Sequence, residues 1–351
     1  MTTEAINAPS VAKRQIKTPV RVALWAMVFL ASVTFAIGTG AISIPVETVW
    51  GVLLNKVFPD TVEQTWSRGR EAIIWDIRFP RVLLAIMVGS GVAIVGAMLQ
   101  AVTRNPLADP HLLGISSGGA FGAILALLHT GLFIGLLTVP LLAFCGALIA
   151  TLLILAVTRF TQSSGADRLV LTGVAISFIV MAAANILIFL GDPEATHTVV
   201  FWMLGGVGLA QWAHLVYPLA ILAPCACWAF WKAPLLNAMT IGDETATTLG
   251  IAVPRFRLQA FVIAALVTGV MVAFSGMIGF VGLMVPHIAR RFVGGDYRRV
   301  IPVSGLIGGL FMIWADIVAR MVVAPEDLPI GVVTGLVGGC FFLWLIRAKS
   351  Q

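Results

Sequence analysis

Three groups of polar residues interrupt a strongly apolar chain, and they are the candidates for its functional sites. The first group is Arg78-Phe79-Pro80-Arg81, in which two guanidinium groups flank a rigid Phe-Pro step. A fixed pair of guanidinium groups is suited to bidentate binding of carboxylates on another protein. The same arginines could instead lay their aliphatic stems along a membrane and keep their charges in water. The sequence leaves both interpretations open.

The second group lies in the segment 232–257, the longest connection on the predicted inner side. A short helix is expected there, because two acids favour its positive end and a glycine can end it in the left-handed conformation. An alanine and a leucine three positions apart would give this helix an apolar face that fits a groove of a soluble motor subunit. A capped, solvated helix is the simpler alternative. The residues concerned are Asp243, Glu244, Ala246, Leu249 and Gly250.

The third group consists of two Gly- and Pro-rich interruptions, residues 104–110 and 276–287. Non-helical backbone at membrane depth is tolerated only where it is buried in protein or lines an aqueous cavity. Each interruption precedes or contains a short apolar segment in its own half of the chain. Their corresponding positions suggest an inverted repeat, although either one could be a simple kink.

The rest of the chain must position these groups inside a bilayer. Its 351 residues are 59% hydrophobic and 11% charged, less than half the charged share of about 25% in soluble domains. Apolar runs of this length predict an all-α polytopic membrane protein with about ten transmembrane helices. The third and eighth spans are short and rich in glycine. The predicted spans are 22–41, 82–102, 113–128, 136–157, 169–190, 212–231, 258–274, 278–288, 300–323 and 331–345.

The distribution of positive charge predicts the orientation. With both termini in the cytoplasm, all but six of the 22 Lys and Arg residues fall on the inner side, as the positive-inside rule requires. The net charge of +6 therefore needs no nucleic-acid partner. Residues 1–21 are expected to be a cytoplasmic tail, and 22–351 a single transmembrane domain. The six on the outer side are Lys56, Arg68, Arg70, Arg78, Arg81 and Arg320.

Resident cofactors, metals and catalytic residues are not expected. The four cysteines lie in apolar runs without C-x-x-C spacing, and the five histidines do not form a ligand set. The sequence contains neither an H-E-x-x-H motif nor a Gly-x-Ser-x-Gly elbow, which argues against an intramembrane hydrolase. The Walker A pattern is absent as well, so any use of ATP requires a separate chain.

At these interruptions the chain resembles the membrane-spanning permease subunits of bacterial ABC importers for iron–siderophore complexes, haem and cobalamin. The likeness runs from about residue 40 to the end of the chain. It rests on several motifs in order, so a chance match is improbable. The motifs are RFPR at 78–81, RNPLADP at 104–110, LLGIS at 112–116, GFVGLMVPH at 279–287, ADIVAR at 315–320 and LPIGVVT at 328–334.

The resemblance implies a type II ABC importer permease fold. It also implies a homodimer in the inner membrane, two cytoplasmic ATPase subunits and a periplasmic binding protein. By position, Arg78, Arg81 and Arg320 would receive acids of the binding protein, although Asp316 offers Arg320 a rival salt bridge one turn away. The helix around 243–250 would be the coupling helix.

The cytoplasmic gate of the family maps onto Asn105 and Leu107, and onto Ala166 and Asp167 in the loop between the fourth and fifth spans. Ala166 and Asp167 replace the small hydroxyl residues of the cobalamin permease, which weakens the cobalamin assignment.

The predicted function is import of an iron–siderophore complex by ATP-driven alternating access, with haem and cobalamin as the next choices of cargo. The permease itself would not be an enzyme. An ion-gradient-driven secondary transporter is the alternative of a different class. Such transporters carry acids near the bilayer midplane, whereas Asp316 is the one acid well inside a predicted span, and Arg320 lies beside it.

Overall fold

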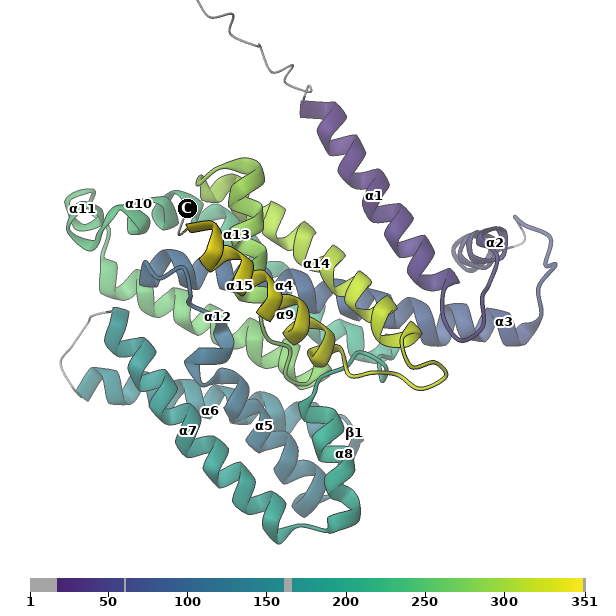
Figure 1. Ribbon diagram of the computed structural model, residues 1–351, viewed down its shortest axis with the longest axis horizontal. Helices are drawn as coiled ribbons and strands as arrows, with labels where there is room; N and C mark the ends of the chain where they lie inside the picture. Colours follow the sequence, from purple (N-terminus) through teal and green to yellow (C-terminus); the bar gives the residue numbers. More distant parts are fainter. Residues whose placement is uncertain (1–17, 60, 161–165, 350–351) are drawn as a thin grey trace, which may run out of the picture.

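Apolar segments of membrane length fold as helices throughout the computed structural model, which describes residues 18–59, 61–160 and 166–349 (Figure 1). The α-helices are α1 (Thr18–Gly38), α2 (Val46–Val57), α3 (Arg68–Ala72), α4 (Phe79–Thr103), α5 (Ile115–Leu125), α6 (Thr138–Phe160), α7 (Ala166–Leu190), α8 (Pro193–Met203), α9 (Trp212–Trp231), α10 (Ala233–Ile241), α11 (Asp243–Thr248), α12 (Val253–Ser275), α13 (Val281–Val293), α14 (Tyr297–Met321) and α15 (Ile330–Lys349). Four shorter elements join them: the π-turns η1 (Ile73–Arg78) and η3 (Ala126–Thr130), the 3-10 turn η2 (Pro110–Leu113) and the extended segment β1 (Phe133–Leu136).

The predicted all-α polytopic fold is confirmed, and each of the ten predicted spans corresponds to a helix. Six helical stretches are long and apolar enough to cross a membrane, and α1, α5 with η3, and α15 are shorter apolar helices. The eighth predicted span, 278–288, corresponds to α13, whose 13 residues rise only about 20 Å. Helices α5 and α13 are thus short, as predicted for the third and eighth spans. Of the predicted tail, residues 1–17 lie outside the described part, and α1 already begins at Thr18.

The amphipathic α2, the short α8 and α10 lie outside the predicted spans and were not predicted from the sequence. Asp192 caps α8 by accepting the N–H of Glu194 at 3.0 Å, and Pro193 occupies its first turn, where the missing N–H costs nothing. With eleven residues, α8 is too short and too polar to be recognised as a span. Figure 1 shows α2 and α3 at the right of the bundle, and α10 and α11 at the opposite, upper left end.

The second span begins earlier than predicted, because α3, η1 and α4 form one helix from Arg68 to Thr103. Pro80 lies near the junction of η1 and α4. A proline within a helix lacks one hydrogen-bond donor and its ring clashes with the preceding turn. The π-turn directly before it widens the helix there by one residue. The helix therefore continues through the Arg78-Phe79-Pro80-Arg81 motif, which was expected to lie at its entrance.

Helix α4 forms the centre of the bundle. Its most apolar stretch is 78% buried, against 11% for α7 at the periphery, and it packs on α9, α12, α13 and α14. Pairs of glycines bring the backbones into contact: a Cβ added to Gly96 would lie 1.8 Å from the carbonyl oxygen of Gly282, and one on Gly89 would lie 2.1 Å from that of Gly308. Such small residues let membrane helices approach closely.

We expect Gly96→Ala to lower the stability of the protein by about 1–3 kcal/mol or more, because a backbone carbonyl cannot rotate away from the added methyl group. Gly335→Ala is the matched control, since the site of its Cβ in α15 has nothing within 4 Å. There the change should be neutral or stabilise by about 0.5–1 kcal/mol. The measurement is the thermal unfolding midpoint of the purified protein in detergent. Equal midpoints for the two variants would contradict the close packing of α4 on α13.

Candidate functional site

Arg78 lies in η1 and binds the end of α1 and the connection that follows it. Its side chain donates to the carbonyl oxygens of Ile37 at 2.8 Å, Gly38 at 3.1 Å and Ile42 at 2.6 Å. The last carbonyls of a helix have no partner within the helix, and the guanidinium group satisfies them. Arg78 is only 7% exposed. In the isolated subunit it therefore fixes α1 against α4.

Arg81 and Arg320 share the buried carboxylate of Asp316. Arg81 Nε donates to Asp316 Oδ1 at 2.8 Å, and its Nη1 donates to Asp327 Oδ2 at 2.5 Å. Arg320 Nε lies 2.9 Å from Asp316 Oδ2, although this N–H does not point at the oxygen, so the pair is electrostatic. The predicted salt bridge between Arg320 and Asp316 is thus present. Asp316 is 1% exposed, whereas the Asp327 side chain is 40% exposed.

Arg320 also binds the end of α1, by donating to the carbonyl oxygens of Ala36 at 3.0 Å and Thr39 at 2.6 Å. The structure therefore brings the three predicted docking arginines into one cluster, where the ends of α1 and α14 meet the start of α4. Sequence reasoning missed Asp327 and the α1 carbonyls. An acid in the proline-rich connection after α14 was the only available signal for Asp327.

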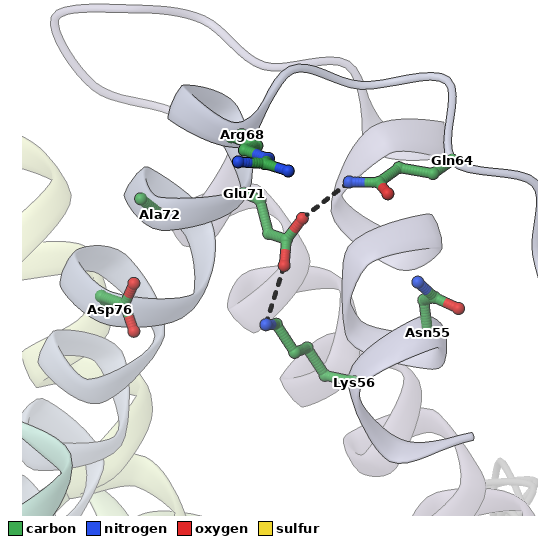
Figure 2. Close-up of a pocket in the computed structure, with 7 residues that line it drawn as sticks. All are labelled: Asn55, Lys56, Gln64, Arg68, Glu71, Ala72 and Asp76. Atoms are coloured by element: carbon green, nitrogen blue, oxygen red, sulfur yellow. Dashed lines mark hydrogen bonds and ion pairs between the residues drawn. The ribbon is translucent and has the colours of Figure 1, made fainter. Parts of the chain in front are cut away.

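A shallow hollow of about 380 Å³ lies between α2 and α3 (Figure 2). Glu71 crosses it, paired with Lys56 Nζ at 2.7 Å and accepting from Gln64 Nε2 at 3.0 Å. Arg68 and Asp76 line the hollow as well, so its charge is mixed. These contacts fasten α2 and Gln64 to α3, and the hollow has no single sign of charge that would select a ligand.

The predicted gate residues Asn105 and Leu107 lie in the turn after α4. Arg104 ends α4 in the left-handed conformation, with φ of 51°. Asn105 Oδ1 then accepts the N–H of Leu107 at 2.9 Å, and the Leu107 side chain is 49% exposed. The turn is thus ordered and presents an apolar side chain. Ala166 and Asp167 open α7, but their side chains lie outside the described part of the chain.

The two Gly- and Pro-rich interruptions contact each other. His287 Nε2 donates to the carbonyl oxygen of Pro106 at 3.1 Å. Gln100 Nε2 donates to the carbonyl oxygen of Gly282 at 3.2 Å, and Arg290 donates to Gln100 Oε1 at 2.5 Å. Sequence reasoning related the interruptions only by their positions in an inverted repeat. In the structure, α13 is the direct support of the turn after α4.

The turn between α4 and α5 also buries Asp109, whose Oδ1 accepts the N–H of His111 at 2.7 Å. Burial raises the pKa of the Asp109 carboxyl and lowers that of the His111 imidazole. Both shifts favour the uncharged forms, which cost less to bury than ions. Uncharged forms of both side chains are compatible with the burial of this connection within the bundle.

The predicted short helix in segment 232–257 is α11. It ends in a Schellman motif, with Ile251 N donating to Ala246 O at 3.0 Å and Gly250 N to Thr247 O at 2.9 Å. Gly250 has φ of +81°, which confirms its predicted left-handed conformation. Glu244 is exposed at the first turn.

The predicted apolar face of α11 is wrong in one respect. Ala246 is fully buried against the rest of the subunit, whereas Leu249 is 64% exposed. The two side chains therefore do not share an exposed face. Because Leu249 follows the last turn of this very short helix, three-residue spacing does not place it above Ala246. Of the two, only Leu249 is available to a partner.

The sequence and the fold have counterparts among known proteins. The hemin transport system permease HmuU of Yersinia pestis is 37% identical over 307 residues, which cover 84% of this chain and 85% of that protein. The Fe(3+) dicitrate permease FecC of Escherichia coli is 35% identical, with 80% and 84% covered. The vitamin B12 import permease BtuC of Klebsiella pneumoniae is 37% identical, with 75% and 78% covered.

A solved structure described as an inward-facing conformation of a metal-chelate type ABC transporter has the same fold. It superposes with a TM-score of 0.81 at 26% identity and covers 94% of this chain and 99% of its own. The model of the FecCD transport family matches residues 28–348. The resemblance predicted from the motifs is confirmed, and the chain belongs to the FecCD transport family as a multi-pass permease of an ABC importer.

Proposed function

We propose that this permease imports a ferric siderophore by ATP-driven alternating access. Membership of the FecCD family carries this proposal. The relatives are named for hemin, ferric dicitrate and vitamin B12, all of which are metal chelates too large for a narrow ion pore. In the working complex two copies of this chain form the path, two separate subunits hydrolyse ATP, and a binding protein delivers the cargo. Each partner favours one arrangement of the helices, and this differential affinity moves the gate.

The charged residues argue against a gradient-driven transporter. An acid that carries protons or sodium ions must be able to exchange its partner. Asp316 lies between Arg81 and Arg320 and is 1% exposed. This arrangement supports a structural role for the Asp316 carboxylate, and we therefore propose ATP as the energy source.

Docking of the binding protein is proposed at the arginine cluster formed by Arg78, Arg81 and Arg320. Each arginine is 7–8% exposed and internally bound, so an incoming carboxylate must share or replace a partner. Asp327 is the partner easiest to replace, because it is the most exposed and belongs to a loop. Charge reversal at Arg81 is unsuitable as a test, since it would place three carboxylates together.

We therefore expect Asp327→Asn to strengthen binding of the loaded binding protein about two- to tenfold at low salt, because a neutral amide holds Arg81 Nη1 more weakly than a carboxylate and a negative charge leaves the docking surface. The effect should shrink at high salt. The measurement is the dissociation constant of the binding protein from the reconstituted transporter. Asp76→Asn, which removes another exposed acid, in η1, is the matched control. Equal constants for wild type and Asp327→Asn would contradict docking at this cluster.

The cargo is tested with three probes. Proteoliposomes containing the permease, its ATPase subunits and its binding protein are supplied with a ferric siderophore, hemin or cobalamin. We expect ATP-dependent uptake of the siderophore at a higher rate than of the other two. Preferential uptake of hemin or cobalamin would contradict the proposed cargo but not the proposed mechanism. Uptake driven by an ion gradient without ATP would contradict the mechanism itself.

A further inference from the structure

Arg257 joins three parts of the inner end of the molecule. It lies in the first turns of α12, and its side chain is 4% exposed. Nη2 lies 2.8 Å from Asp243 Oδ1 and 2.9 Å from Oδ2, at the start of α11. Nε donates to the carbonyl oxygen of Val102 at 3.1 Å, in the last turn of α4. One guanidinium group therefore binds the candidate coupling helix and the central helix at once.

The α4 end of this junction leads directly into the predicted gate turn. Val102 is followed by Thr103, the last residue of α4, and by Arg104 in the left-handed conformation. Arg104 Nε lies 3.9 Å from Asp243 Oδ1, so the same carboxylate attracts the residue before the gate. Asn105 and Leu107 follow. A displacement of Asp243 would therefore act on Val102, three residues before the gate residue Asn105.

The chemistry of the junction makes it stiff. A carboxylate bound by a buried guanidinium group forms strong, directional, charge-assisted hydrogen bonds. Separating such a pair leaves a charge without a partner in a poorly solvated place, which is strongly unfavourable. The rest of α11 is attached mainly by Ala246, which packs against the subunit. A small apolar contact of this kind holds α11 on the subunit but does not fix its orientation. The directional hydrogen bonds between Asp243 and Arg257 therefore determine how a movement of α11 is passed to α4.

We infer that Arg257 is a positioning residue that transmits movement of α11 to the gate turn at residues 104–107, through Asp243 and the carbonyl group of Val102. This rests on the proposed function, in which an ATPase subunit moves α11. Without the junction, α11 would move with the motor while the end of α4 stayed behind. The expected defect is uncoupling: ATP is hydrolysed and the gate does not respond.

A reporter at the gate tests the inference without knowledge of the cargo. In a variant whose four cysteines are replaced, Leu107→Cys is labelled with a water-soluble maleimide in proteoliposomes that contain the ATPase subunits, with and without ATP and vanadate. We expect ATP with vanadate to change the labelling rate of the reporter protein. Arg257→Gln and Asp243→Asn should each reduce that change about tenfold while ATP hydrolysis continues.

A double-substituted protein separates transmission from general damage. If the two side chains act as one unit, Arg257→Gln with Asp243→Asn has no larger effect than either change alone. Arg257→Lys, which keeps the charge but loses the fork, should restore part of the response. Arg255→Gln, at an exposed arginine two positions away, is the matched control and should leave the response unchanged.

Two results would overturn the inference. The first is a full response in Arg257→Gln with normal assembly. The second is an equal loss in Arg255→Gln, which would mean that charge on this face, and not the junction, matters. Failure of the proposed function itself has a different signature, because the reporter protein without further substitutions would then show no response to ATP. That result would overturn the inference too, since there would be no movement to transmit.

Discussion

Asp316→Asn is expected to destabilise the permease by about 3–5 kcal/mol, because it leaves two buried guanidinium groups without their shared carboxylate. Asp316 is 1% exposed and lies within 3 Å of both Arg81 and Arg320. Asparagine has nearly the same shape, so loss of charge and not loss of volume would be the cause. The protein should be recovered in low yield, with a clearly lower unfolding midpoint in detergent.

Asp327→Asn is the matched control for this prediction. It removes the other acid bound to Arg81, but that carboxylate is 40% exposed. An ion pair that remains in contact with water is worth about 0–1 kcal/mol, so the midpoint should change little. A midpoint for Asp316→Asn as high as that of Asp327→Asn would show that water reaches the cluster and that its arginines are not held as the structure indicates.

Leu249→Asp is expected to remove most binding of the ATPase subunits. Leu249 is 64% exposed after α11, and a leucine anchor in a partner's groove contributes about 2–4 kcal/mol, or roughly 30- to 1,000-fold in affinity. A carboxylate forced into such a groove adds a desolvation cost. The measurement is the amount of ATPase subunit that co-purifies with the permease, together with ATP-dependent uptake.

Two variants control this experiment. Leu209→Asp makes the same change at a leucine that is 86% exposed in the α8–α9 connection, at the other end of the bundle, and should leave ATPase binding unchanged. Ala246→Glu should instead lower the stability of the permease itself, because Ala246 is buried within the subunit. If Leu249→Asp retained its ATPase subunits and its transport rate, the coupling contact would have to lie elsewhere.

The helical fold followed from the sequence because hydrocarbon leaves the backbone no alternative. Each apolar segment must satisfy its own N–H and C=O groups, so length and composition alone identify it as a helix. The span at residues 212–231 has the same bounds in the structure. Elements outside this constraint were harder to predict. Helix α8 is short and polar, and its signals, Asp192 at the cap and Pro193 after it, mark a helix start without indicating its length.

The partners of the charged residues were decided only by the tertiary structure. The sequence around Arg78 shows no partner for its side chain, yet this side chain binds carbonyl groups about 40 positions earlier. Arg81 and Asp327 are 246 positions apart. No local pattern encodes such pairs, because they arise where the ends of separate helices meet. The same holds for Arg257, which has no motif around it and yet binds the end of α4.

The sequence by itself determined the fold class, the family and the regions that carry polar chemistry, since these depend on composition and on short ordered motifs. Tertiary packing decided which side chains remain available to a partner. Ala246 and Leu249 show the difference: their spacing suggests one face, but the chain after α11 turns at Gly250 and leaves one buried and the other exposed. Burial is a property of the neighbours that surround a residue, and those neighbours come from helices far away in the chain.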